Sequence, residues 1–209
     1  MCFVMDRSRS GAVLARHAGI DEKTGQLLPG ADGGPRRLVI SSDFYAVYQS
    51  AGKKAGGLVN LYCAAHVRRH FVRAGDASPV QLKYWTDAWL ERFRDLYRAH
   101  DELTAAWQAG TAPTAREKKA AAERLGKAHE GWDTAIGAID EARKKQVQAP
   151  GLQEPAKRAL ATLDREWDGL IAHRDYPMVS LDNYADGAVM PVSAVRGGSA
   201  AGQGGALAA

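Results

Sequence analysis

The stretch LVISSDFYAVY, residues 38–48, decides the fold expected for this chain. It begins with a short apolar run, Leu38 to Ile40, and passes through two serines to the carboxylate of Asp43. This pattern predicts a buried strand that leads into a helix. In α/β folds, ligands bind at the carboxyl ends of the strands, because the backbone leaves the sheet there and opens a crevice. Asp43 is therefore a candidate functional acid, and its alternative role is to cap the helix that follows.

A second stretch, residues 58–71, repeats the arrangement. A strand-like run from Leu58 to Tyr62 leads into Cys63-x-x-His66 and then into a basic helix start. No Asp or Glu occurs from Phe44 to Gly75, whereas five cations lie in that interval: Lys53, Lys54, Arg68, Arg69 and Arg73. An isolated acid beside a wholly basic surface suits a metal site that acts on a polyanion. The alternative for the arginines is a solvated helix face.

These residues resemble the insertion sequence 66 family of DDE-type bacterial transposases. In that family one strand ends in Ser-Asp-x-Tyr-x-x-Tyr and the next ends in Cys-x-x-His-x-Arg-Arg-x-Phe. Two further segments fit in the same order: SRSGAVL, residues 8–14, and YPMVSLDN, residues 176–183. The resemblance spans about Ser8 to Pro191. It implies an α/β fold with a mixed, ribonuclease H-like sheet and a helical insertion, and DNA cleavage and strand transfer by two-metal phosphoryl transfer.

The resemblance also implies three acidic metal ligands, and Mg²⁺ or Mn²⁺ as the metal. Asp43 matches the second acid. The family's terminal motif, Asp-Asn-Asn-x-Ala-Glu-Arg, corresponds here to residues 182–187, where Asp186 stands for the Glu and Gly187 for the Arg. Asp186 is thus the expected third acid and the partner ligand of Asp43, with a solvated turn residue as its alternative. The strand that carries the family's first acid is expected to be missing, because Asp6 is the sole early acid and suits a helix cap better.

Cys63 and His66 raise the question of a zinc site. With His70 they would lie on one face of a helix start, but no second Cys-x-x-Cys or Cys-x-x-His occurs in the chain. Zinc is therefore not expected. We expect a structural role instead, in which Cys63 is buried and His66 is hydrogen-bonded near the functional edge. Arg68, Arg69 and Arg73 are the expected DNA contacts.

The middle of the chain changes character after Ala77. Apolar residues recur at spacings of three and four in three stretches, which predicts three amphipathic helices separated by short breaks at 110–113 and 149–151. We expect one shared apolar core that contains Trp85, Trp89, Phe93, Trp132 and Trp167. The charged residues Lys118, Lys119 and Arg143 to Lys145 alternate with glutamates, which favours surface ion pairs over a DNA track.

Four parts are therefore expected along the chain. They are a partial ribonuclease H-like core in residues 1–77, a helical insertion in 78–175, the end of the catalytic core in 176–192, and a disordered Gly/Ala-rich tail in 193–209. Composition agrees with a folded domain: 45% of the 209 residues are hydrophobic and 25% are charged. Two cysteines cannot form a disulfide framework, and neither a signal sequence nor a membrane-spanning run is present. A cytoplasmic location is expected.

Two functions remain open from the sequence. The first is a transposase catalytic domain that is truncated and inactive as the chain stands, since one acid is absent and another is shortened. The second is a non-enzymatic remnant that binds DNA, associates with itself or binds full-length transposase through its helices. The net charge of +4 is compatible with both. DNA binding without cleavage would distinguish the second function from an active enzyme.

Overall fold

The sheet contains the two strands that were expected, and a third. The computed structural model describes residues 11–43, 46–111, 114–182 and 189–191. Within these residues β1 (Leu38–Ser42) lies between β2 (Leu58–Tyr62) and β3 (Val189–Pro191). The pairing of β1 with β2 is parallel, with Leu38 opposite Leu58, and its pairing with β3 is antiparallel. The chain is thus mixed α/β and mostly helical, and its assignment to a ribonuclease H-like fold stays a prediction.

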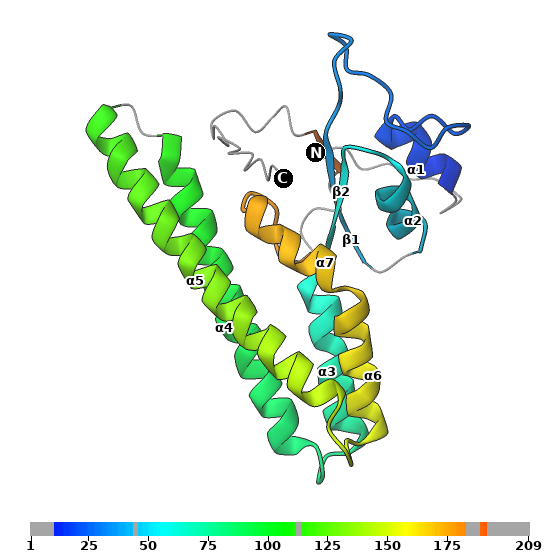
Figure 1. Cartoon of the computed structure of the whole chain (residues 1–209), viewed down its shortest axis with the longest axis vertical. Coiled ribbons are helices and arrows are strands. Elements are labelled where there is room, and N and C mark those ends of the chain that lie inside the picture. The colour runs from blue at the N-terminus through cyan, green and yellow to red at the C-terminus, as the bar shows by residue number, and fades with distance from the viewer. Residues whose placement is uncertain (1–10, 44–45, 112–113, 183–188, 192–209) are drawn as a thin grey trace, which may run out of the picture.

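Two helices lie on one side of this sheet (Figure 1). They are α1 (Gly11–Ala18), which begins within the SRSGAVL stretch, and α2 (Ala46–Lys54), which begins shortly after Asp43. Leu14 of α1 packs with apolar residues of the strands in a small core: Leu38, Ile40 and Leu58. The alternation of residues along a strand places these three side chains on the same face of the sheet. The short run from Cys2 to Met5, whose sequence also favours a strand, lies outside the described residues.

The helical part contains a long antiparallel pair, α4 (Lys83–Gln108) and α5 (Ala115–Val147). A short 3-10 turn, η1 (Ala109–Thr111), follows α4. The 33 residues of α5 correspond to a length of about 50 Å. Thr114 begins α5 with a capping box, in which its side chain accepts from the backbone of Glu117 and the Glu117 side chain accepts from the backbone of Thr114. Figure 1 shows this end of the pair projecting away from the rest of the helices.

The expected aromatic core is confirmed. Trp89, Phe93 and Trp132 are fully buried in one cluster, and Trp85 and Trp167 pack against it. The indole nitrogens of Trp85 and Trp89 both donate to the side-chain oxygen of Gln146, at 2.7 and 2.9 Å. The polar edges of both rings are therefore satisfied inside an apolar environment.

The helical assembly has one more member than the three helices that were expected. Helix α3 (Ala64–Ala77), which follows β2, packs against α4 and against α6 (Glu154–Arg165). Its buried residues Val67, Phe71 and Ala74 recur at spacings of four and three, which form one apolar face. The Phe71 ring lies 4.6 Å from that of Trp89, between centroids. The sheet unit and the helical core are thus continuous through α3.

The third expected helix is interrupted. It consists of α6 and of the short α7 (Trp167–Ile171), with a break at Glu166 and a 3-10 turn, η2 (Ala172–Asp175), at its end. At the break the backbone of Glu166 leaves helical geometry, with φ −96° and ψ 9°. Its side chain turns inward and is only 1% exposed. The change of direction places α7 against β2.

Surface charges on α5 follow the expected pairing at one end only. Arg143 and Lys144 pair with Asp140, at 2.7 and 2.6 Å, so surface ion pairs form there as expected, although the acid is an aspartate and not one of the glutamates. The same expectation is wrong for Lys118 and Lys119, since neither forms an ion pair with a described residue. The neighbouring Glu117 is already used by the capping box. Over the described part of the chain, no helix is both long and apolar enough to cross a membrane.

A glycine fixes the contact between α7 and the sheet. Gly169 is buried, and a methyl group at this position would overlap the ring of Tyr62 on β2. We predict that Gly169→Ala lowers the free energy of unfolding by about 1–3 kcal/mol, because the ring or α7 must move. Denaturant unfolding followed by circular dichroism measures this difference.

Gly137 in α5 is the matched control, because nothing lies within 4 Å of a Cβ built there. Gly137→Ala should leave stability unchanged or raise it by up to about 1 kcal/mol, through helix propensity. Equal effects of the two substitutions would contradict close packing at Gly169.

Candidate functional site

Asp43 lies at the carboxyl edge of the sheet, directly after β1, and is half-buried. The adjacent strand ends at the same level, since the backbone N–H of Cys63 donates to the carbonyl of Ser42 at 3.1 Å. The hydroxyl of Ser42 donates to Asn60 Oδ1 at 2.8 Å and links β1 to β2 once more. The two sequence stretches that were expected to form a functional edge therefore meet, at the position where α/β sheets bind ligands.

The segment near the end of the chain reaches the same edge. The N–H of Ala64 donates to the carbonyl of Leu181 at 2.8 Å, and the N–H of Ala65 donates to Asp182 Oδ1 at 3.1 Å. Both donors belong to the first turn of α3, whose N–H groups have no partner within the helix. Asp182 thus satisfies a helix start, and Leu181 beside it is buried.

A tyrosine of the long helix α4 completes this contact. Tyr97 donates its hydroxyl to Asp182 Oδ1 at 2.5 Å. Burial raises the pKa of Tyr97, and the hydrogen bond to Asp182 raises it further, so the phenol stays protonated and acts as a donor. Two turns along α4, the hydroxyl of Thr104 donates to the carbonyl of Pro177 at 2.7 Å. Residues 177–182 therefore lie along α4, held at both ends.

Two buried histidines lie behind the edge. His173 is fully buried, and its Nε2 is 3.1 Å from the carbonyl of Tyr62, so a protonated Nε2 donates to the last residue of β2. Its ring meets that of His100 edge-on, with 5.8 Å between centroids. Burial lowers the pKa of both groups, that of His173 to about 4, and each imidazole is therefore neutral near pH 7.

The buried carboxylate of Glu166 ties the helices to α2. It accepts from the side-chain nitrogen of Gln49 at 2.7 Å and from Arg165 Nε at 2.5 Å. A buried carboxylate requires such partners, because desolvation of the charge is costly. Since α2 begins just after Asp43, this bond connects the helical part to the element that follows the candidate acid.

The other predicted site residues take separate positions. Cys63 is fully buried and His66 is half-buried, both at the start of α3. Three arginines are exposed along α3: Arg68, Arg69 and Arg73. Asp186 lies outside the described residues, and so does its predicted approach to Asp43. The structure therefore brings together Asp43, the start of α3 and Asp182.

Asp43 alone does not complete a metal centre. Mg²⁺ and Mn²⁺ prefer carboxylate oxygens, and a two-metal centre needs several of them. Among the described residues, no group of three or more His, Cys, Asp or Glu side chains could hold a metal ion. Of the predicted metal ligands, only Asp43 lies within the described residues, directly after β1.

Sequence reasoning missed the polar residues that connect the parts of this site. Tyr97 and Thr104 lie within an amphipathic pattern that indicates only a helix, and Glu166 resembles any surface glutamate. The sequence did point to Asp182 as a functional position, because it is the first residue of the stretch that resembles the family's terminal motif. Its role as the partner of α3 depends on contacts between residues more than 80 positions apart.

We predict that Tyr97→Phe lowers the free energy of unfolding by about 1–3 kcal/mol, because it removes a hydrogen bond to a charged, partly buried carboxylate. Tyr84→Phe is the control, since Tyr84 is 84% exposed and should change stability by less than about 0.5 kcal/mol. Denaturant unfolding of both variants measures the difference. A Tyr97→Phe protein as stable as the control would contradict the role of this bond.

Acidification should destabilise the fold through His173. Its folded pKa is lowered to about 4 from 6.5, so the unfolded chain binds the proton more strongly. The contribution of neutral His173 to the free energy of unfolding is complete above pH 6.5 and is lost as the pH falls toward 4. Between pH 7 and pH 5 this loss amounts to about 2 kcal/mol. Unfolding of wild type and His173→Gln at both pH values tests this, since the variant should lose less stability over that interval. The same loss in both proteins would rule out His173 as the cause.

The comparisons with known proteins agree with the motifs at this edge. A family model described as Transposase IS66 family matches residues 1–196 of the 209. The search of curated proteins and the search of solved structures each give no match. The matched span includes both strand-end motifs, the helical part and the segment around Asp182. This chain therefore belongs to the IS66 family of transposases.

Proposed function

We propose that this chain is a DDE-type transposase domain that acts on the DNA ends of an insertion element, with Asp43 as a metal ligand. One observation carries the proposal. The strand that ends at Asp43, the Cys63-x-x-His66 helix start and the segment at Asp182 are hydrogen-bonded to one another at a single sheet edge. These are the parts of the sequence that resemble the family's motifs. Family membership supports a transposase function for the whole arrangement.

The chemistry requires acids and cations at this edge. Two divalent metals would activate the attacking oxygen and hold the leaving oxygen of a phosphodiester. Asp43 would bind one of them, and the exposed arginines of α3 would contact phosphates. We propose Asp186 as the further ligand. Asp182, four residues earlier, is anchored at the edge, and four extended residues span at most about 14 Å.

We also propose that the chain does not catalyse transposition by itself. Asp186 stands where the family motif has Glu, and its carboxylate is one methylene shorter. Gly187 replaces an Arg and removes a cation from the neighbourhood of the phosphate. A metal held by fewer or misplaced ligands loses the geometry that stabilises the transition state. A non-enzymatic role in DNA binding would then depend on the cationic surfaces and not on Asp43.

We predict that the purified protein, with Mg²⁺ or Mn²⁺ and the DNA ends of its parent element, produces no cleavage or strand transfer. Gel analysis of labelled DNA ends is the measurement. Cleavage by wild type that disappears in Asp43→Asn would contradict the proposed inactivity while supporting the role of Asp43.

Mn²⁺ binding tests Asp43 separately from activity. Asp43→Asn should weaken Mn²⁺ binding, followed by electron paramagnetic resonance, by about tenfold or more. Asp76→Asn, at an exposed acid near the end of α3, is the control and should leave Mn²⁺ binding unchanged. Equal binding by all three proteins would exclude Asp43 as a metal ligand.

A further inference from the structure

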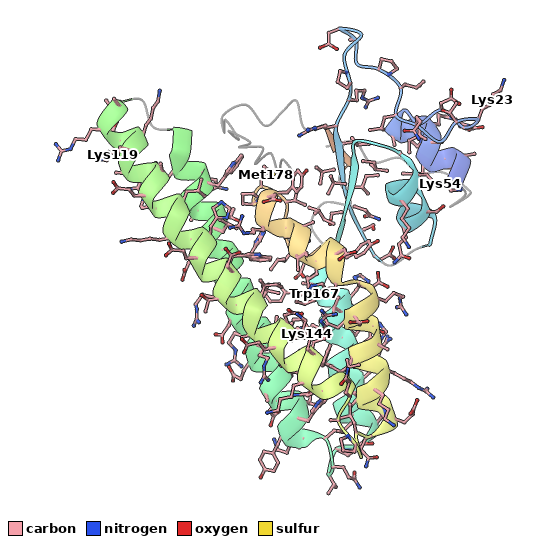
Figure 2. All side chains as sticks on the ribbon, viewed as in Figure 1. Lys23, Lys54, Lys119, Lys144, Trp167 and Met178 are labelled. Carbon is pink, nitrogen blue, oxygen red and sulfur yellow. The ribbon has the colours of Figure 1, made fainter. Side chains whose placement is uncertain are left out.

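The free end of the α4–α5 pair carries an exposed cationic face that the proposed site does not use. It consists of four residues in the first half of α5: Arg116, Lys119, Arg124 and Lys127. The spacings of three, five and three residues place them within an arc of about 140° around the helix. Arg124 is at the edge of this arc that lies nearest the buried Ala121 and Ala128. Figure 2 shows Lys119 pointing outward from this end.

Several exposed cations elsewhere on the helices are paired, as in Lys83 with Asp87 at 2.9 Å and Arg94 with Glu91 at 2.6 Å. Others, such as Arg73 and Lys157, form no ion pair with a described residue. None of the four on the cationic face forms an ion pair with a described residue. The face therefore keeps its positive charge for an external partner.

The acids of this segment neutralise its cations only in part. Only two occur between Arg116 and Lys127. Glu117 accepts from the backbone of Thr114 at 3.1 Å and from its hydroxyl in the capping box, which lowers the pKa of the Glu117 carboxyl. Glu123 is the other acid. The segment has five cations, the four of the face and Lys118, so its net charge is +3 (5 − 2).

The dimensions of the face suit a nucleic-acid backbone. From Arg116 to Lys127 the helix rises about 16 Å, which is close to the length of five base pairs at 3.4 Å each. The four charges lie on one continuous helix, and its first half projects beyond α6 (Figure 1).

We propose that the cationic face of α5 binds the phosphate backbone of duplex DNA independently of base sequence. Charge complementarity is the argument for this partner, because duplex DNA is a dense polyanion whose binding by cations releases counterions. The choice of DNA as the polyanion rests on the proposed function. It adds a second contact, separate from the arginines of α3 and from the sheet edge at Asp43.

Two quadruple variants of the full chain test this proposal. The face variant is Arg116→Gln, Lys119→Gln, Arg124→Gln and Lys127→Gln. The control variant is Lys83→Gln, Arg94→Gln, Arg98→Gln and Arg158→Gln, four exposed cations that are ion-paired. Each variant removes four charges and changes the net charge from +4 to 0 (4 − 4), so the two are matched in total charge.

Fluorescence anisotropy with a labelled duplex of arbitrary sequence, from 50 to 200 mM salt, is the measurement. The slope of log K against log salt concentration should become shallower by about 3–4 in the face variant, since each phosphate contact contributes about 0.9. The control should change it by less than about 1. Circular dichroism checks that each variant is folded. If the face variant unfolds, the double variant Lys119→Gln and Lys127→Gln replaces it. The slope of this double variant should be shallower by about 2.

Three outcomes would overturn the proposal. An unchanged slope in the face variant excludes the contact, and an equal change in both variants shows that only total charge matters. If the face variant instead alters self-association in analytical ultracentrifugation while its slope is unchanged, the face is an interface between copies. Asp43→Asn should keep the wild-type slope, so a failure of the metal proposal remains distinguishable from a failure here.

Discussion

The carboxylate of Asp182 joins three parts of the chain that are remote in sequence. It accepts from the N–H of Ala65 at the start of α3 and from the hydroxyl of Tyr97 on α4, and the residue before it is bonded to Ala64. A buried or partly buried carboxylate is costly to leave without partners, so each of these donors constrains the others. The sheet edge after β1, the helix after β2 and the long helical pair therefore depend on one another.

The helical part therefore also holds in place the elements that lie next to Asp43. Glu166 bonds to Gln49 of α2, His173 bonds to the carbonyl of Tyr62, and Gly169 packs on the Tyr62 ring. All three residues belong to the break between α6 and α7 or follow it, and all three act on elements next to Asp43. The helical segment, which lies between β2 and β3 in the chain, thus helps to fix the geometry at the edge of the sheet.

Much of the fold could be predicted because its signals are local. The strands around residues 38–42 and 58–62, the break near 110 and the burial of Trp89 and Trp132 follow from runs and periodicities that a few residues define. The missed features depend on partners far along the chain. The bend at Glu166 and the membership of α3 in the helical core require contacts that no periodicity indicates. Lys119 forms no ion pair with a described residue, and the neighbouring Glu117 is hydrogen-bonded to Thr114 instead.

The sequence by itself determined most of the elements, the aromatic part of the apolar core and the family, since hydrophobic periodicity and short motifs are properties of neighbouring residues. It also identified Asp43 as the acid at a strand end. Only the tertiary structure decided that Asp182 is a partner of α3 and Tyr97. It also decided that four cations of α5 form no ion pair with any residue in the described part of the chain. Hydrogen bonds and ion pairs between distant residues depend on distances of a few ångströms, which are set when the elements pack.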